Sequence, residues 1–397
     1  MLSAFCTTPS PTSRATGDWR PLPGNGAWSY RYYLTEADWA DWAMEYPDQI
    51  VWRSADYLRM LHAHPQDITT GAVAVRRRSD ARTILLTVQD FTLRPGEQIL
   101  KQPGKKELRG ALVRWLAGQF RPRVLVIGQL LVSGPWGTDG LSGIAPSVAA
   151  DVLEAVVQLQ SAETSYHGVV IKDVASAGSP MTATLKSRGF LQLSPDPVMT
   201  MDLRPHPDFD HYLAALSSKY RVRYRRARKM MGALRRQELK AAEADRWLPL
   251  IYDLHRETRQ GADFKFGTLT PEYFVWLGRH AQFYGYFDGA ELVGFTTGVA
   301  AGETFFAHYL GLRDRYKYTH HLYHNMLYDL LEDALERGFS VLDYGRTALE
   351  IKSSLGAQPQ EFPLLFRSRS SLVDRLLRGG LGHLYRPTHW TERNPFK

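Results

Sequence analysis

The order in which the sequence predicts helices and strands occurs twice, and this repetition limits the fold more than any single motif does. In each half, a hairpin is followed by a strand, a helix, a strand, a helix and a last strand. Between the halves, residues 204–208 (RPHPD) contain two prolines, each of which disfavours helix in the residue before it. The halves share no obvious residue identity, so we expect two tandem copies of one mixed α/β fold.

The length of the chain agrees with this division. At roughly 100–200 residues per domain, 397 residues favour two domains. We expect a flexible leader at 1–26, a first domain at 27–205, a second domain at 206–370 and a basic amphipathic tail at 371–397. Each domain is expected to hold a mixed, mainly antiparallel sheet flanked by helices.

Charge and cysteine content narrow the kinds of partner and chemistry. Lys and Arg exceed Asp and Glu by 49 − 41 = +8, which favours an anionic partner such as phosphate groups, nucleic acid or an anionic membrane. The single cysteine, Cys6, argues against a disulfide framework, a Cys-based zinc site and thiol catalysis. The sequence contains neither a signal-peptide pattern nor an apolar run of about 20 residues. We expect a cytoplasmic protein, with contact at the inner membrane face left open.

Several short motifs resemble those of a known group of enzymes. They are residues 342–347 (LDYGRT), followed by Glu350, Lys352 and residues 356–357 (GA), together with residues 218–221 (SKYR) and 227–229 (ARK). With the order of elements, which covers nearly the whole chain, they resemble the tandem-GNAT acyltransferases of the FemAB-like and BioF2-like (CelD-type) group. Similar patterns occur in bacterial proteins assigned to peptidoglycan synthesis and in predicted ceramide synthases. The resemblance implies an α/β (α+β) chain of two GNAT-like domains that acts as an acyltransferase.

The turn that usually binds the donor's phosphates departs from the GNAT pattern. A GNAT domain holds pyrophosphate on a glycine-rich turn before a helix, where backbone N–H groups face the anion. The second half has residues 313–321 (RDRYKYTHH) at this place, without glycines. Arg313, Arg315 and Lys317 can still neutralise phosphate there. Because members of the group with this departure use aminoacyl-tRNA or carrier-bound donors, acyl-CoA is one of several expected donors.

The first half offers a second candidate for donor contact. Its loop at 134–143 (GPWGTDGLSG) is rich in glycine, and Gly134 and Gly137 are the residues expected to approach phosphate. A tight structural turn is the alternative, since Pro135 and Trp136 lie within the loop and Asp139 opposes an anion.

Three side chains are candidates for proton transfer or for stabilising the oxyanion of acyl transfer. His308 and Tyr309 lie within the predicted strand 304–312, which the resemblance places beside the acyl-transfer cleft. Adjacent residues of a strand face opposite sides of the sheet, so we expect only one of the two in the cleft. Glu257, on the predicted helix 247–260, is a third candidate base, with an exposed carboxylate as the alternative.

A further set of candidates follows the strand that ends near Asp343. Ligands of open α/β sheets collect at the carboxyl ends of strands, so Asp343 is a candidate catalytic residue and Tyr344, Arg346 and Lys352 are candidates for substrate binding. Arg346 can bind a carboxylate or phosphate through two parallel hydrogen bonds. The alternative is a structural ion pair between these bases and Asp343 or Glu350.

The densest positive charge lies between residues 219 and 236, within a stretch that we expect to be one long helix over 209–236. The basic residues are Lys219, Arg221, Arg223, Arg225, Arg226, Arg228, Lys229, Arg235 and Arg236. Tyr220 and Tyr224 interleave with them, as in a surface that binds tRNA. Contact with phospholipid heads or with an acidic carrier protein, and a solvated face, are the alternatives. Residues 371–386 form a second basic amphipathic segment, which suggests contact with a membrane or packing on the second domain.

These features together predict an N-acyltransferase that passes an acyl group from acyl-CoA or an acyl-carrier protein to the amine of a small or lipid-like molecule by direct attack. One alternative is a FemAB-like transferase that uses aminoacyl-tRNA, and another is a non-catalytic RNA-binding protein on a GNAT scaffold. We expect no permanently bound cofactor. His320 and His324 have the spacing of metal ligands, but no matching carboxylate or Cys motif is nearby, so we expect no metal site.

Overall fold

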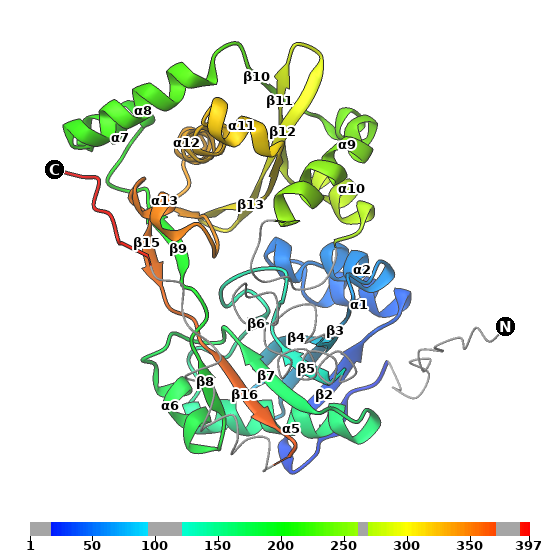
Figure 1. Cartoon of the computed structure of the whole chain (residues 1–397). Coiled ribbons are helices and arrows are strands. Elements are labelled where there is room, and N and C mark those ends of the chain that lie inside the picture. Colours follow the sequence, from blue (N-terminus) through cyan, green and yellow to red (C-terminus); the bar gives the residue numbers. More distant parts are fainter. Residues whose placement is uncertain (1–16, 94–120, 261–268, 371–389) are drawn as a thin grey trace, which may run out of the picture.

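The chain forms two mixed sheets flanked by helices (Figure 1). The structure is a computed structural model that describes residues 17–93, 121–260, 269–370 and 390–397. The first sheet has the order β1-β2-β3-β4-β5-β7-β16-β8, with β6 paired to β4, and the second has the order β10-β11-β12-β13-β14-β9-β15. Most neighbouring strands are antiparallel, whereas β5–β7 and β13–β14 are parallel. The predicted mixed, mainly antiparallel α/β architecture is therefore confirmed.

The strands of the first sheet are β1 (Arg20–Leu22), β2 (Asn25–Tyr33), β3 (Ile68–Arg77), β4 (Thr83–Thr92), β5 (Arg123–Ile127), β6 (Thr138–Asp139), β7 (Gly168–Lys172), β8 (Leu191–Leu193) and β16 (Leu364–Ser368). Those of the second are β9 (Val198–Asp202), β10 (Arg235–Glu238), β11 (Gln282–Asp288), β12 (Glu291–Ala301), β13 (Thr304–Leu312), β14 (Val341–Asp343) and β15 (Gln358–Gln360). The helices are α1 (Glu36–Glu45), η1 (Val51–Arg53), α2 (Ala55–Ala63), α5 (Pro146–Glu163), α6 (Pro180–Ser187), α7 (Phe209–Ala215), α8 (Ser218–Met231), α9 (Ala241–Gln260), α10 (Pro271–His280), α11 (Asp314–Thr319), α12 (Leu322–Glu336) and α13 (Leu349–Ser353).

Alternating side chains of each sheet supply separate cores on its two faces. In the first sheet, β3 turns Val73 and Val75 toward α5 and turns Ala72 and Ala74 toward α1 and α2. In the second sheet, α9 and α10 cover one face and α12 covers the other. The core under α9 and α10 also takes in residues of η1 and α2, such as Trp52. The two halves of the chain are thus joined by a shared hydrophobic core.

Each half also gives one strand to the sheet of the other. Strand β9 belongs to the first half of the sequence but pairs with β14 and β15 of the second sheet. Strand β16 comes late in the sequence but lies between β7 and β8 of the first sheet. In Figure 1, β16 runs as an orange arrow among the green strands of the first half. The predicted boundary at 205/206 therefore does not coincide with the boundary between the sheets.

Several predicted elements differ from those observed. Residues 17–26 of the expected leader are ordered from β1 onward. The expected helix over 209–236 is interrupted, because Leu216 leaves helical geometry between α7 and α8, and Arg235 and Arg236 begin strand β10. The interruption has a physical cause: Leu216 is buried and forms a β-bridge with Phe396.

The predicted amphipathic segment 371–386 lies outside the described residues, as does Cys6. In the portions of the chain that the structure describes, no helix is both long enough and apolar enough to cross a bilayer.

The exchange of strands predicts that the first half is incomplete without β16. A fragment of residues 17–205 leaves the backbone groups of β7 and β8 that face β16 without partners. We expect this fragment to lack cooperative thermal unfolding and amide protection in β7, as measured by calorimetry and hydrogen exchange. The matched control is the same fragment joined through a flexible linker to residues 361–370, which we expect to restore both. Equal melting temperatures for the two fragments would contradict the assigned role of β16.

Candidate active site

Strand β13 of the second sheet separates from β14 partway along its length. The parallel pairing of these strands covers only Thr304–Phe306 of β13, although β13 continues to Leu312. On its other side, β13 contains a bulge opposite β12, because the register passes from Thr296↔Leu310 to Gly298↔Ala307. His308 and Tyr309 therefore both lie opposite Thr297. The Thr297 hydroxyl accepts from the Tyr309 N–H (3.0 Å) and donates to the Tyr309 carbonyl (2.8 Å).

The bulge brings His308 and Tyr309 into one cluster. Their ring centroids are 4.4 Å apart, and they lie 5.9 and 5.7 Å from the ring of Tyr273. Adjacent residues of a strand normally face opposite sides of the sheet, but the extra residue in β13 interrupts this alternation, and both rings contact Tyr273.

His308 is the best-defined polar group of this cluster. Its Nε2 lies 2.7 Å from the Tyr273 hydroxyl, which is itself 3.2 Å from the hydroxyl of Tyr57. The ring of Trp52 packs on the imidazole at 4.6 Å between centroids. The side chain of His308 is half-buried, and its desolvation lowers the pKa of the imidazole to about 3. His308 is therefore neutral at physiological pH.

The hydroxyl of Tyr309 is protonated and donates a hydrogen bond. Burial raises the pKa of its hydroxyl above the usual value, so the phenol keeps its proton. The hydroxyl lies 3.5 Å from the carbonyl oxygen of Leu131, in the first half of the chain. The ring also contacts the ring of His255 at 5.5 Å.

Two buried indole N–H groups beside this cluster make no hydrogen bond to any described residue. They belong to Trp52 and Trp136, whose rings contact Phe306 of β13 at 5.3 and 5.2 Å. Buried donors are nearly always paired in proteins. Two buried donors beside the face of β13 that carries Phe306 and His308 therefore lack a partner among the described residues.

Sequence reasoning missed the aromatic residues around His308. Trp52, Tyr57 and Tyr273 belong to no recognisable motif, and Tyr57 and Tyr273 are 216 positions apart. The only signal in the sequence was the high density of aromatic residues in these two segments.

Glu257 occupies a structural position. It forms an ion pair with Arg313 at 2.8 Å and accepts from the backbone N–H of Asp314 at 2.8 Å, at the first turn of α11. Burial raises the pKa of this carboxyl, but these two contacts outweigh it, so the net shift is downward. The lowered pKa makes the Glu257 carboxylate a weak general base, and both of its oxygens already have partners in the protein.

The predicted phosphate-binding cations do not form a cradle. Arg313 is held by Glu257, and Arg315 contacts the hydroxyl of Tyr316 and lies 3.5 Å from Glu291. Lys317 is exposed on α11. The depression beside Arg313, about 360 Å³ in volume, is lined by Asp253, Arg256, Glu257 and Arg313, so acids and bases balance there.

The glycines of the first-half loop serve packing. The N–H of Gly134 donates to the carboxylate of Asp173 at 3.0 Å, so it is not available to phosphate. At Gly137, a Cβ atom would lie 2.5–2.6 Å from the backbone of Gly128 and Gln129, which no real side chain tolerates. The alternative of a tight structural turn fits both positions, because close approach of backbone requires glycine.

A buried cluster of charges joins the two halves near this loop. The carboxylate of Asp173, which is 0% exposed, pairs with Lys172 and accepts from Arg346 at 3.0 Å. Arg346 also donates to the carbonyl oxygens of Asp196 and Phe362. Arg346 is thus held from several sides by the protein itself, in agreement with a structural ion pair, although with a different acid from the two considered in the sequence.

Lys352 supports the loop that follows β14. Its Nζ donates to the carbonyl oxygens of Tyr344, Gly345 and Arg346 at 2.6, 3.2 and 2.8 Å. Thr347, the next residue of this loop, has a positive φ of 78°, which costs conformational energy for a non-glycine residue. The hydrogen bonds from Lys352 hold this strained backbone in place.

The side chains around this loop are buried, which disfavours their charged forms and their contact with a substrate. Burial raises the pKa of Asp343 to about 7 and lowers the pKa of Lys352 to about 7. The carboxylate of Asp343 accepts from the N–H of Gly345 at 2.6 Å. Tyr344 is buried in the core and donates to the carbonyl oxygen of Leu327 at 3.0 Å. Each predicted residue of this set therefore has a protein partner.

The histidines with metal-like spacing are not assembled into a site. Nδ1 of His320 lies 2.7 Å from the Thr319 hydroxyl, and the rings of His321 and His324 are 5.8 Å apart. Over the described ranges, no cluster of three or more His, Cys, Asp or Glu side chains has the geometry to hold a metal ion.

Comparison with known proteins supports the expected reaction class. Residues 218–353 match the family described as acetyltransferase (GNAT) domain. No curated protein sequence matches the chain. Among solved structures, FemX is similar with a TM-score of 0.55 at 11% identity, over 87% of this chain and 98% of that chain.

The fold is tandem GNAT-like, and the chain is an acyltransferase. Two further structures span both halves at lower similarity. The L-PGS of Bacillus licheniformis aligns with a TM-score of 0.48 at 13% identity, over 88% of this chain and 97% of that chain. A tandem GNAT protein from the clavulanic acid biosynthesis pathway aligns with a TM-score of 0.48 at 12% identity, over 86% and 99% of the two chains. The resemblance to FemAB-like proteins is confirmed at the level of fold, and the match to the acetyltransferase (GNAT) domain family covers residues 218–353.

The environment of Asp173 predicts a large effect on stability. In Asp173→Asn, Lys172 and Arg346 lose their buried counter-charge, which costs about 3–5 kcal/mol. We expect the denaturation midpoint to fall accordingly in guanidinium titrations. The matched control is Asp80→Asn on the β3–β4 turn, where an exposed carboxylate pairs with Arg77, and here we expect almost no change. Equal effects of the two substitutions would show that the junction cluster has no special role.

Proposed function

We propose that the protein forms an amide bond by direct attack of an amine on an acyl thioester, carried by coenzyme A or by a carrier protein. The observation that carries this proposal is the neutral, half-buried His308 on the bulge of β13, hydrogen-bonded to Tyr273 at 2.7 Å. It lies on the stretch of β13 beyond its pairing with β14, within the part of the chain that matches the GNAT family.

The state of His308 favours a role as hydrogen-bond donor. A general base works best with a pKa near the operating pH, whereas the pKa of this imidazole is about 3. If Tyr57 donates to Tyr273 and Tyr273 donates to Nε2, the proton of the imidazole is on Nδ1. No described residue accepts from Nδ1, so this N–H is available to the oxyanion that forms on the thioester carbonyl.

The reaction requires no covalent enzyme intermediate. The amine nitrogen attacks the carbonyl carbon, the C–N bond forms and the C–S bond breaks. The thiolate leaves and takes up the proton that the amine releases. The chain contains one cysteine, Cys6, in the predicted leader. Burial raises the pKa of the Tyr273 and Tyr309 hydroxyls, which keeps them protonated and makes them poor nucleophiles.

The identity of the donor depends on what holds its phosphates. Arg313, Arg315 and Lys317 remain candidates for donor phosphate, although the first two have acidic partners. A carrier protein, which delivers a thioester on a long arm, needs no glycine cradle. The acceptor is a small or lipid-like amine. Aminoacyl-tRNA is the alternative donor, and the same attack then breaks a C–O bond.

The donor class can be tested with the full-length protein. We expect amide products when the protein is incubated with an acyl-CoA panel or acyl-carrier protein and a mixture of amines, followed by mass spectrometry. Turnover that depends only on aminoacyl-tRNA would replace the thioester by an ester donor. A stable acyl group on any side chain of the protein would exclude direct attack.

The role of His308 predicts a specific pattern among variants. His308→Phe removes the donor, and we expect kcat to fall about 100- to 1,000-fold, whereas His308→Gln keeps an N–H and should lose less. Tyr273→Phe removes the hydrogen bond that positions the imidazole and should lower kcat with little change in KM. The pH profile of the wild type should show no imidazole ionisation near pH 6–7. A limb at that pH that disappears in His308→Gln would instead identify His308 as a general base.

A further inference from the structure

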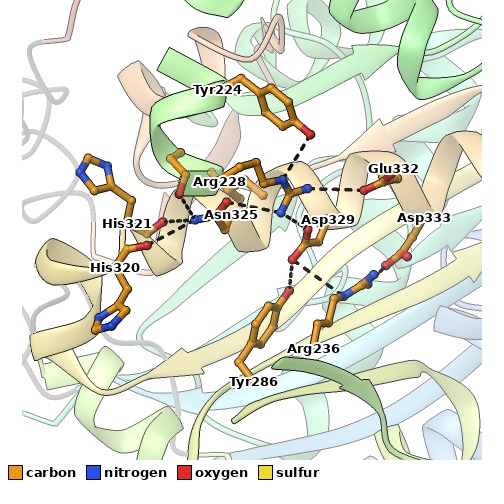
Figure 2. A network of polar contacts seen from close by, with 12 residues as sticks. Tyr224, Arg228, Arg236, Tyr286, His320, His321, Asn325, Asp329, Glu332 and Asp333 are labelled. Carbon is orange, nitrogen blue, oxygen red and sulfur yellow. Dashed lines mark hydrogen bonds and ion pairs between the residues drawn. The ribbon is translucent and has the colours of Figure 1, made fainter. Parts of the chain in front are cut away.

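Most of the basic segment between residues 219 and 236 lies on helix α8, which has an inner face toward the protein and an outer face toward solvent. On the inner face, Tyr220 and Ala227 are buried, and the Arg228 guanidinium reaches α12, where it lies 2.5 Å from Asp329. Figure 2 shows this contact within a network that also contains Arg236, Tyr286 and Asn325. The helix therefore has a fixed rotation about its axis.

The network beneath α8 neutralises part of the positive charge of the basic segment. Three carboxylates of α12, those of Asp329, Glu332 and Asp333, face Arg228 and Arg236 (Figure 2). The hydroxyl of Tyr286 donates to Asp329 at 2.7 Å, and the side-chain amide of Asn325 donates to the carbonyl oxygen of Ala227 at 2.9 Å. Two of the nine cations are thus neutralised.

Two more cations are bound to backbone. Arg221 donates to the carbonyl oxygen of Leu216, and Arg235 donates to that of Gly289 at 2.9 Å. The remaining five form what we call the outer face of α8. They are Lys219, Arg223, Arg225, Arg226 and Lys229, all exposed and none in an ion pair with a described residue.

Exposed apolar side chains lie among these five cations. Val222 is 57% exposed and Met230 is 39% exposed, and they are two of the four large apolar side chains that the described residues expose. At about 100° per residue, residues 222, 226 and 230 form one row, and the five cations and two apolar residues fall within an arc of about 160°. This outer face combines positive charge with aliphatic groups and contains no acid.

The orientation of the tyrosines distinguishes lipid from RNA. Proteins that bind single-stranded nucleic acid stack bases on exposed aromatic side chains. Tyr220 is only 7% exposed, and Tyr224 packs on Tyr328 at 4.9 Å and contacts Arg228. The outer face instead offers aliphatic groups between cations, which is the pattern of helices that lie at the surface of an anionic bilayer.

We propose that the outer face of α8 docks the protein on an anionic phospholipid membrane. The cations contact lipid phosphates, and Val222 and Met230 enter the headgroup region. The contact is mainly electrostatic, since only two apolar side chains take part, and it is expected to weaken with salt. The docking surface does not depend on the reaction proposed above, because it lies on a helix that contains none of the proposed catalytic groups.

The test uses the full-length protein and vesicle flotation. We expect binding to vesicles of equal parts phosphatidylglycerol and phosphatidylcholine and none to pure phosphatidylcholine. Replacing Lys219, Arg226 and Lys229 with Gln should weaken binding about 100-fold, at about fivefold per cation near the surface. The control replaces the exposed Lys186, Arg246 and Arg279 with Gln, which gives the same net charge. Equal losses in the two triple variants would overturn the proposal.

A second variant separates lipid from nucleic acid. Val222→Ser combined with Met230→Ser keeps all the cations, so we expect weaker vesicle binding and unchanged affinity for bulk tRNA at the same salt concentration. Unchanged vesicle binding in this variant would overturn the insertion of these side chains. Tight tRNA binding that the Lys219, Arg226 and Lys229 triple variant abolishes, with vesicle binding intact, would assign the face to RNA instead. Melting temperatures of all variants should match the wild type, because the substituted side chains are exposed.

Discussion

The fully buried carboxylate of Asp173 lies where the two halves of the chain hold each other. It follows β7, the strand that pairs with the exchanged strand β16, and it binds Lys172 from its own half and Arg346 from the other. Three positively charged or N–H donors around one carboxylate give the geometry that a buried ion needs. Because β9 and β16 cross between the halves at this level, the relative position of the sheets depends on these contacts.

The junction between the halves determines which side chains surround His308 on β13. The bulge that brings His308 and Tyr309 together is local to β12 and β13, but Trp52 and Tyr57, which surround His308, come from the first half. The first half also lowers the polarity around the imidazole, and that desolvation keeps His308 neutral. The candidate active site is therefore a product of both halves, although the match to the GNAT family covers residues 218–353.

The sequence patterns predicted the fold class but not which strands pair with one another across the two halves. The repeated order of elements is a local signal, and it predicted the observed architecture. The placement of β16 in the first sheet depends on pairing with strands far away in sequence, which no local pattern records. Charged residues posed a similar problem: Arg346 looked like a substrate ligand because Asp173, its partner 173 positions earlier, could not be recognised. The bulge at His308 likewise depends on the register of a partner strand.

The composition of the basic segment between residues 219 and 236 was clear from the sequence. The sequence did not show which of its side chains face solvent. Tyr220 and Tyr224 interleave with cations in the sequence, but a spacing of four residues says only that they share a face of a helix. Burial decides which face this is, and the acids of α12 select Arg228 and Arg236 as the cations that turn inward. Five exposed cations of α8 have no acidic partner among the described residues, against a formal excess of +8 for the whole chain. Much of the net positive charge is therefore concentrated on one helix face, where it acts on a partner rather than on the stability of the fold.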